Sequence, residues 1–433
     1  MHIFAFVDST KTISTGGLNL QASRIAIIGA GPIGLEAALY ATQLGYDVTL
    51  FEKDEVGANI LEWGHVTLFS PWSMNYSALG VCSIKKHLRS WDEPGPDDYL
   101  TGKEYVQTYL APLSKLPALE GKIHAGCRIE SVGRQQLLKD SLIGDPNRAK
   151  YPFRILTTDA VGNEQVFFAD IVIDSSGVYD NPNWIGEGGI PAIGEQKHKD
   201  LIDYKLIDFS GSHRSRFAGK RTLLIGSGYS AAASACDLQK LTQAEPATSV
   251  VWAIREDRFP PIPVIANDAL PNRAKLTQAA NSIAQNDSPQ VRFRNHTSVE
   301  SVRYYEDRDR FEVSLHSNGS VATIEVDRIV ANVGYSPDNS IYRELQIHEC
   351  YASRAPMKLS AALLGAASAD CLQQTSLGAD TLKNPEPNFY IIGSKSYGRN
   401  STFLMRIGFS QITEVFSLIT SDPKLNLYQM QGS

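Results

Sequence analysis

The stretch from Arg24 to Lys53 constrains the fold of this chain more than any other. A short apolar run, Ile25–Ile28, leads into a turn with three glycines, and apolar side chains then recur at helical spacing. A second apolar run, Val48–Phe51, follows and ends on the acid Glu52. This order predicts a strand, a helix that stops near Gly45 and a second, parallel strand, which together form a βαβ unit.

The glycines of the turn have the spacing of a dinucleotide-binding motif, Gly29-x-Gly31-x-x-Gly34. The first glycine permits the tight turn, the second lets a diphosphate approach the backbone, and the third lets helix and strand pack closely. The diphosphate then lies on the helix N-terminus, and Glu52 accepts hydrogen bonds from an adenosine ribose. The candidate residues of this first site are Gly29, Gly31, Pro32, Ile33, Gly34, Glu52 and Lys53.

A second strand and glycine turn begins at Arg221. It reads Gly226-x-Gly228-x-x-Ala231, where alanine meets the need for a small third side chain. The following strand ends on Arg255 in place of an acid, and a guanidinium can pair with a ribose 2′-phosphate. NADPH is therefore favoured over NADH, although Arg255 can also be an ordinary solvated residue. The candidate residues of the second site are Gly226, Ser227, Gly228, Tyr229, Ser230, Ala231 and Arg255.

Two dinucleotide motifs in one chain imply hydride transfer between their ligands. The first site suits FAD, because Glu52 fits an unphosphorylated ribose, and the second suits NADPH. The predicted fold class is α/β, with two Rossmann-like dinucleotide-binding domains and the NAD(P) domain inserted into the FAD domain. From the linker Gly186–Pro191 we expect residues 1–185 to form the first part of the FAD-binding domain, 186–333 the NAD(P)H-binding domain and 334–433 the C-terminal part of the FAD-binding domain.

The remaining segments alternate between strands and helices. Residues 1–23 are expected to form a lead-in or a short edge strand, and Tyr99–Leu116 a helix ended by Pro117. Residues 123–134 are predicted as one strand, followed by a hairpin with its turn at Gly162-Asn163 and a buried strand at Ile171–Ile173. Later strands are expected at Arg303–Val313, Ser320–Val333 and Phe389–Ile392, with a turn at Asn318-Gly319 and a C-terminal amphipathic helix.

Length and charge exclude several classes of protein. A chain of 433 residues suggests two or three domains, at roughly 150 residues each. Lys and Arg number 41 against 47 Asp and Glu, for a net charge of -6, and no basic run marks a nucleic-acid partner. Nowhere do enough apolar residues follow one another for a membrane span, and the start lacks the features of a signal peptide. We expect a cytoplasmic protein.

The five cysteines are scattered and never spaced as Cys-x-x-Cys. This spacing excludes a local dithiol pair and a zinc knuckle, and no metal site is predicted. Structural burial is the expected role of each cysteine, with Cys82 as the alternative of a lone redox thiol. The aromatic loop at residues 61–80 is either part of a flavin or substrate wall or plain packing. His65 and His198 can orient or protonate a ligand, or can be structural.

These motifs resemble the two-dinucleotide flavoproteins, and more narrowly the flavin-containing monooxygenases and thioredoxin-reductase-like enzymes. Phe217-x-Gly-Lys-Arg221 before the second motif is similar to the monooxygenases, as is the spacing from Gly194 to His198, although Ala192 stands where that family has Phe. Ser176-Gly177, at the end of its strand, resembles an Ala-Thr-Gly motif of the group. Disulfide-reductase relatives carry Gly-Asp at Gly393-Ser394. The resemblance implies further cofactor-binding residues: Ile129, Ser176, Gly177, Gly393 and Ser394.

The resemblance implies an oxidoreductase with FAD and NADPH. The first expectation is a monooxygenase, in which reduced flavin adds oxygen and the resulting peroxyflavin oxygenates a small N, S or carbonyl substrate. The alternatives are an NADPH-dependent reductase of a small disulfide or quinone that works without a cysteine pair, and a non-enzymatic flavin-binding redox sensor. No residue is assigned a catalytic role, since the flavin carries the chemistry. A small-molecule substrate and a possible homodimer are expected.

Overall fold

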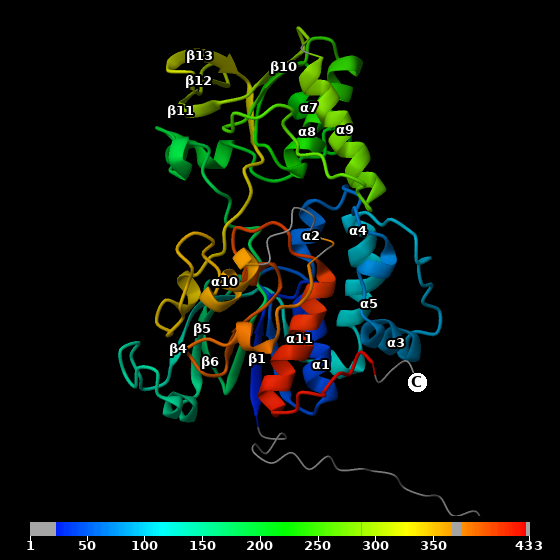
Figure 1. Ribbon diagram of the computed structural model, residues 1–433, viewed down its shortest axis with the longest axis vertical. Coiled ribbons are helices and arrows are strands. Elements are labelled where there is room, and N and C mark those ends of the chain that lie inside the picture. Colours follow the sequence, from blue (N-terminus) through cyan, green and yellow to red (C-terminus); the bar gives the residue numbers. More distant parts are fainter. Residues whose placement is uncertain (1–22, 287, 366–371, 373, 430–433) are drawn as a thin grey trace, which may run out of the picture.

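Two bodies follow one another along the long axis of the molecule in the computed structural model, which describes residues 23–286, 288–365, 372 and 374–429 (Figure 1). The lower body contains both ends of the described chain, in blue and cyan and in orange and red, and the upper body contains the green and yellow middle. The predicted insertion of one dinucleotide-binding unit into the other is confirmed. The lead-in predicted for residues 1–23 lies outside the described residues except for Ser23, and so does Cys371.

A parallel sheet of five strands forms the centre of the lower body. Its order is β15-β7-β1-β2-β3, so the chain leaves β1 on one side to form β2 and returns on the other side to form β7. Strand β15 joins this sheet from the C-terminal part of the chain. The strands are β1 (Arg24–Ile28), β2 (Asp47–Phe51), β3 (Ile123–His124), β7 (Ile171–Asp174) and β15 (Phe389–Ile391).

Helices cover one face of this sheet and a small antiparallel sheet covers the other. Helix α1 (Pro32–Gln43) packs against α11 (Met405–Thr420), where the rings of Tyr40 and Phe416 stack with centroids 4.9 Å apart. The opposite face packs against the strands β4, β5 and β6 in one apolar cluster. The other elements of this body are α2 (Ala58–Glu62), α3 (Ala78–His87), α4 (Gly102–Tyr105), α5 (Ala111–Ser114), β4 (Cys127–Arg134), β5 (Phe153–Asp159), β6 (Glu164–Ala169) and α10 (Met357–Gly365).

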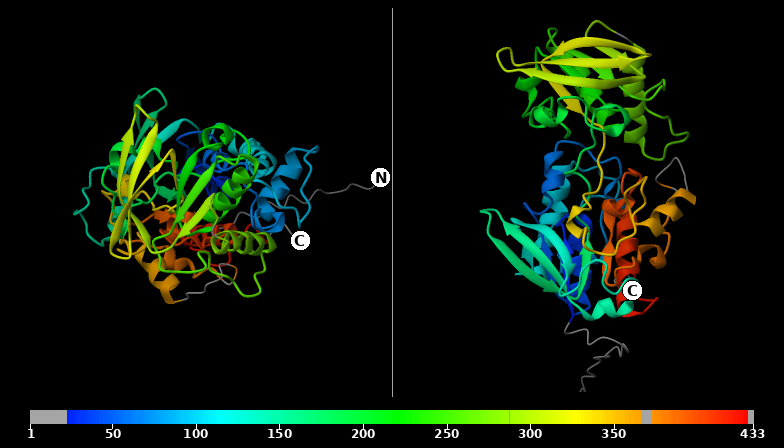
Figure 2. Two further views of the ribbon diagram at one scale, coloured as in Figure 1. Left: turned by 90° about the horizontal axis from the view of Figure 1, so that it is seen from above. Right: turned by 90° about the vertical axis from the view of Figure 1, so that its left-hand side faces the viewer.

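The upper body repeats this three-layer arrangement on a smaller scale. Its parallel sheet has the order β10-β9-β8-β14, with helices on one face and a three-stranded antiparallel sheet on the other (Figure 2). The elements are α6 (Glu195–His198), α7 (Arg214–Phe217), β8 (Arg221–Ile225), α8 (Tyr229–Ala244), β9 (Ser249–Ala253), α9 (Pro271–Gln285), β10 (Val291–Arg294), β11 (Thr297–Tyr305), β12 (Arg310–Ser317), β13 (Ser320–Val326) and β14 (Arg328–Ala331).

Two segments connect the bodies and lie side by side. Pro182 and Tyr335 form an antiparallel bridge, and the backbone N–H of Asn183 donates to the carbonyl of Gly334 at 3.0 Å. The rings of Tyr179 and Tyr335 pack with centroids 4.7 Å apart. The connection is therefore a short paired ribbon, while the domain boundaries at 185/186 and 333/334 stay predictions.

Three of the predicted strands are wrong in their limits. The strand expected at Arg303–Val313 is interrupted by a turn between β11 and β12, where Asp309 has a φ of 48°. The strand expected at Ser320–Val333 is divided at Asp327, because β13 and β14 belong to different sheets. Charged residues make the first turn, without the glycine or proline that marks a turn in sequence. The strand predicted over residues 123–134 is likewise divided, at Gly126.

Other local predictions are confirmed. Residues 102–114 are helical throughout, with a π-helical turn between α4 and α5, inside the helix predicted at Tyr99–Leu116. The hairpin turns between β5 and β6 at Gly162-Asn163, and helix α1 stops just before Gly45, whose φ is 84°. Within the described residues no helix is long and apolar enough to cross a membrane. The four described cysteines are free thiols, of which Cys350 is buried.

A carboxyl group lies inside the lower body, between α1 and the helices around α3 and α5. Glu36 is fully buried; its Oε2 accepts a hydrogen bond from Ser77 Oγ at 2.7 Å, and its Oε1 accepts one from the Tyr109 hydroxyl. Burial raises the pKa of Glu36 to about 7, and these two hydrogen bonds offset the effect only in part. The folded chain therefore favours the neutral, protonated form of this carboxyl group.

We expect Glu36→Gln to remove a pH dependence of stability. In the native protein this group contributes stability that is fully present below its unfolded pKa and is lost as pH rises through about 7, a loss of about 1–3 kcal/mol. Urea unfolding at about pH 5 and about pH 8 measures this loss. Between these pH values the free energy of unfolding should fall less in the variant than in the native protein. Glu120→Gln, an exposed carboxylate, is the control. Equal pH profiles for native protein and Glu36→Gln would contradict this account.

Candidate functional site

The first glycine turn has the shape that its motif requires. Gly29 has a φ of 94°, and a Cβ on it would lie 2.9 Å from Ser176 Cα. A Cβ on Gly34 would lie 1.8 Å from the carbonyl oxygen of Gly29, so only glycine fits there. Gly31, in contrast, has nothing within 4 Å of the place of a Cβ. The turn is therefore closed on the protein side and open at its middle glycine, where a diphosphate would approach.

A groove runs along this turn at the carboxyl ends of the strands. Glu52 lies in it, with Oε2 accepting from the backbone N–H of Ala30 at 2.8 Å and Oε1 from that of Asp54 at 3.0 Å. Lys53 pairs with Asp180 at 2.9 Å. Burial lowers the pKa of Lys53, but the contacts with Asp180 and Asp54 outweigh it and leave that pKa raised. The groove brings together six predicted residues: Gly29, Glu52, Lys53, Ile129, Ser176 and Gly177.

The C-terminal part of the chain completes the wall of the turn. Ser394 Oγ lies 3.4 Å from the place of a Cβ on Gly177, and Ile33 side-chain atoms lie 3.6 Å from that of Gly393. Pro32 begins helix α1, next to Ile33. Sequence reasoning missed the neighbouring residue, Lys395, which lines the groove and forms an ion pair with Asp174.

The second glycine turn repeats this geometry. A Cβ on Gly226 would lie 2.1 Å from the carbonyl oxygen of Asn332, while Gly228 has nothing within 4 Å of the place of a Cβ. Ala231 occupies the third position, and its Cβ lies 3.3 Å from the place that a Cβ on Gly226 would take. Tyr229 and Ser230 begin helix α8 directly after the turn. The backbone thus offers a second helix N-terminus that is open at its middle glycine.

The residues after β9 differ from the sequence-based expectation. Arg255 Nη1 donates to the carbonyl of Gly186 at 3.2 Å, so its side chain is tied to the connecting segment. Glu256 Oε1 accepts from Ser227 Oγ at 2.9 Å, within the glycine turn. Glu52 makes the corresponding contact with Ala30 in the first turn. An acid therefore faces each turn, and the sequence hid the second one because Glu256 stands beyond the end of its strand.

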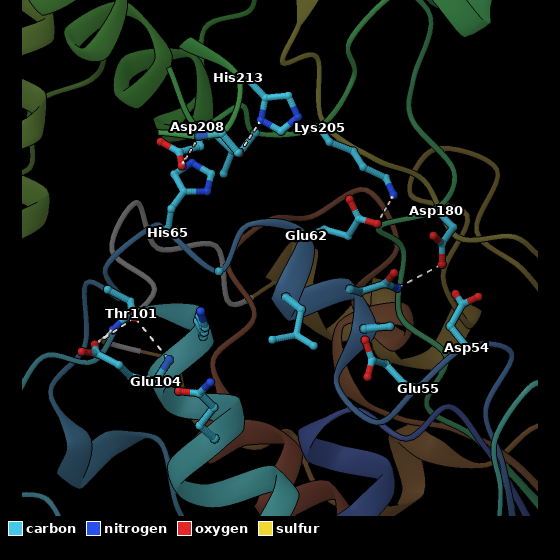
Figure 3. Close-up of a pocket in the computed structure, with 18 of the residues that line it drawn as sticks. Asp54, Glu55, Glu62, His65, Thr101, Glu104, Asp180, Lys205, Asp208 and His213 are labelled. Carbon is cyan, nitrogen blue, oxygen red and sulfur yellow. Dashed lines mark hydrogen bonds and ion pairs between the residues drawn. The ribbon is translucent and has the colours of Figure 1, made fainter. Parts of the chain in front are cut away.

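A cavity of about 970 Å³ lies between the two bodies and adjoins the groove, with which it shares Lys53, Asn59 and Asp180 (Figure 3). Lys205 of the upper body pairs with Glu62 of α2 at 3.3 Å across it. In Figure 3 the ring of His65 lies beside Asp208, and the ring of His213 lies further along the same wall. Burial raises the pKa of Asp208, but backbone N–H donors and the charge of His65 outweigh it and lower that pKa. The cavity is thus polar and charged.

The aromatic loop at residues 61–80 lines the cavity in one part and packs in another, while its role as a flavin or substrate wall stays a prediction. Glu62, Gly64 and His65 form part of the cavity wall. Trp72 is buried and stacks on Tyr76 with ring centroids 4.8 Å apart, which is packing.

Phe69, between these two parts of the loop, contacts Tyr229 at the second glycine turn, with ring centroids 5.5 Å apart. The loop therefore connects the two bodies. His198 packs beside Tyr304 of the upper body, with centroids 6.1 Å apart, and Cys82 is half-buried on α3.

Comparisons with known proteins agree with this arrangement. Residues 26–140 match a family model described as pyridine nucleotide-disulphide oxidoreductase. The dihydrolipoyl dehydrogenase of Halobacterium salinarum is 50% identical over 75 residues, which are 17% of this chain and 14% of that protein. Short matches of this kind span only 7–14% of the length of the curated relatives.

Solved structures resemble nearly the whole chain. A bacillithiol disulfide reductase from Bacillus cereus aligns with a TM-score of 0.66 and 18% identity over 92% of this chain and 99% of that chain. An FAD-bound cadaverine monooxygenase from Erwinia amylovora aligns with a TM-score of 0.59 and 15% identity over 92% and 94%. A thioredoxin reductase from T. acidophilum aligns with a TM-score of 0.56 and 16% identity over 91% and 98%. At these identities the likeness establishes the fold.

The resemblance to two-dinucleotide flavoproteins is thus confirmed, in the residues that match the family model and in the fold of both bodies. Residues 26–140 thus match the family model, and the chain as a whole has the fold of the two-domain FAD/NAD(P) oxidoreductases.

Proposed function

We propose that this protein is an FAD-dependent NADPH oxidoreductase that acts on a small molecule held between its two bodies. One observation carries the proposal: two glycine turns of the same shape, one in each body, with a cavity of about 970 Å³ between the bodies that adjoins the first groove. Transfer of a hydride needs two dinucleotides whose reactive rings can meet, and a glycine turn in each body with a cavity between the bodies supports such an arrangement.

FAD is the proposed ligand of the first groove. Its diphosphate would lie over Gly31 at the N-terminus of α1, and its ribose would reach Glu52. Open space at Gly31 and closed packing at Gly29 and Gly34 fit such a ligand. When bound, FAD supplies the two-electron chemistry. The protein orients it through Lys53, Ile129, Ser176, Gly177, Gly393 and Ser394, which surround the groove or the turn.

The electron acceptor is proposed to be a small molecule. Among the described residues that line the cavity there is no cysteine, so a protein dithiol does not relay electrons there. Electrons can then pass to oxygen, with oxygenation of a small N, S or carbonyl substrate, which is the first proposal. The second is direct reduction of a small disulfide or quinone, which the polar and charged wall of the cavity favours. A homodimer stays a prediction.

Nucleotide preference provides a test of the second site. NADPH is the proposed donor, since Arg258 Nη2 lies 3.4 Å from the carbonyl of Ser227 and Arg255 lies nearby on the same segment. Glu256 Oε1 lies against the same turn. A carboxylate there would repel a 2′-phosphate and accept a hydrogen bond from a free 2′-hydroxyl.

We expect Glu256→Gln to lower the KM for NADPH by about 3- to 10-fold and to raise that for NADH, because one unfavourable charge is removed. Steady-state oxidation of both nucleotides at two salt concentrations measures this, and the gain for NADPH should shrink at high salt. Asp257→Asn, one residue further along, is the matched control. Unchanged KM values for both nucleotides would show that Glu256 lies outside the binding site.

The proposed function is tested with the purified protein and its visible spectrum. Bound flavin should bleach on anaerobic addition of NADPH. An oxygenase should then consume oxygen and NADPH in equal amounts when amines, sulfides or ketones are supplied, with little hydrogen peroxide. A reductase should oxidise NADPH anaerobically when small disulfides or quinones are supplied. Protein that carries no flavin would refute the proposal, and flavin that NADPH leaves oxidised would favour a sensor.

A further inference from the structure

A buried ion pair joins the end of strand β7 to the turn that follows β15, at the groove. Lys395 Nζ lies 2.6 Å from Asp174 Oδ2, and the two side chains are 1% and 0% exposed. Lys395 Nζ also donates to Ser176 Oγ at 3.0 Å, and Ser176 Oγ donates in turn to Asp174 Oδ1 at 2.7 Å. Lysine is rarely buried to this extent, so the position of its charge requires an explanation.

The pair lies beside the place where the order of the strands in the sheet reverses. Strands β1 and β7 are neighbours, yet the chain forms β2 and β3 on the far side of β1 before it returns to β7. Ligands of open parallel sheets bind in the crevice at such a point, beyond the carboxyl ends of the strands. Asp174 is the last residue of β7, and Lys395 follows β15 on the other side of β7. Both Ser176 and Lys395 line the groove.

The ammonium is directed to the glycine turn through Ser176. A Cβ on Gly29 would meet Ser176 Cα at 2.9 Å, so the residue that Lys395 contacts is packed against the turn itself. An ammonium has three N–H donors. Within the described part of the chain, two of them have polar partners, Asp174 and Ser176, while the ring of Tyr342 lies 5.1 Å away. One donor is therefore left for a ligand, and Lys395 is among the residues that line the groove.

We propose that Lys395 binds the diphosphate of FAD from the sheet side of the groove, opposite the N-terminus of α1, and that Asp174 and Ser176 hold its ammonium in place. This inference rests on FAD as the ligand of the first groove. An ammonium beside a diphosphate makes a charge-assisted hydrogen bond, which is stronger than a neutral one. Asp174 and Ser176 are positioning residues, because they act on the ligand through Lys395.

A purely structural pair is the competing explanation, and energetics distinguishes the two. A buried ion pair contributes little net stability compared with neutral side chains of the same volume. Replacement of both charges together, Asp174→Asn with Lys395→Met, should therefore leave folding nearly unchanged and remove only the charge offered to the groove. Lys395→Gln is a second variant that keeps donors for Asp174 and Ser176 and removes the positive charge. The matched control is Asp268→Asn with Arg273→Met, a buried ion pair at 2.7 Å in the upper body.

The experiment measures binding of FAD, ADP, adenosine and riboflavin to the full chain freed of flavin, by fluorescence and by calorimetry. In the double variant and in Lys395→Gln, the Kd for FAD and for ADP should rise about 10- to 100-fold, while adenosine and riboflavin bind as to native protein. The control pair should bind all four as native protein does. Native affinity for FAD in both Lys395 variants, or an equal loss for adenosine and ADP, would overturn the proposal. Native protein that binds no FAD would instead refute the proposed function.

Discussion

Gly228→Val is expected to leave FAD in place and to slow reduction of the flavin by NADPH by about 100-fold or more. Gly228 has open space where a side chain would go and an ordinary negative φ of -98°, so valine should be accepted by the fold. The same side chain would occupy the place at which a diphosphate approaches the turn, and small displacements of a bound reactant have effects of this size. Stopped-flow reduction under anaerobic conditions measures the rate.

The equivalent change at the first turn should have the opposite pattern. Gly31→Val is expected to yield folded protein that has lost FAD, since Gly31 is open in the same way. Gly133→Val is the control, because Gly133 lies on β4, also has nothing within 4 Å and belongs to neither turn. Rapid reduction of the Gly228→Val protein, or loss of its flavin, would show that the second turn does not hold the nucleotide that reduces FAD.

Glu386→Ala is expected to destabilise the protein by about 3–5 kcal/mol, the cost of leaving buried charges without their partner. Glu386 is fully buried and pairs with Arg134 at 2.8 Å and with Arg148 at 2.9 Å, both also fully buried. It further accepts from the backbone N–H of Gln346 at 2.9 Å. Removing the carboxylate leaves two guanidinium groups inside the lower body. Chemical denaturation at neutral pH, followed by circular dichroism, measures the loss.

A matched ion pair at the surface provides the control. Arg214 and Glu245 lie at the same distance, 2.9 Å, but their side chains are 41% and 46% exposed. Glu245→Ala should cost about 1 kcal/mol or less. Burial raises the pKa of Glu386, but the hydrogen bonds from Arg148, Gln346 and Arg134 outweigh it and leave that pKa lowered. The stabilisation should therefore be lost as pH falls through the acidic range. Equal losses for both glutamates would refute this account.

The sequence by itself determined the local units. The spacing of Gly29, Gly31 and Gly34 and of Gly226, Gly228 and Ala231 predicts two strand-turn-helix units, because backbone geometry at a tight turn allows so few side chains. Other short sequence signals predict the hairpin turn at Gly162-Asn163 and the end of helix α1 near Gly45. The order of the two motifs along the chain predicts that the second unit is inserted into the first. The strand limits were less accurate where charged residues form a turn, as between β11 and β12.

Only the tertiary structure decided which charges meet at the sites. Lys395 and Ser176 lie 219 positions apart in the chain, and the buried pair with Asp174 exists because β15 adds to the sheet beside β7. Glu256, not Arg255, contacts the second turn, since the chain bends after β9 and brings the Glu256 side chain to Ser227. The cavity between the bodies likewise has walls from both. Such contacts depend on the pairing of segments that are far apart in the chain. No local sequence pattern encodes them, because only the folded sheet brings these side chains together.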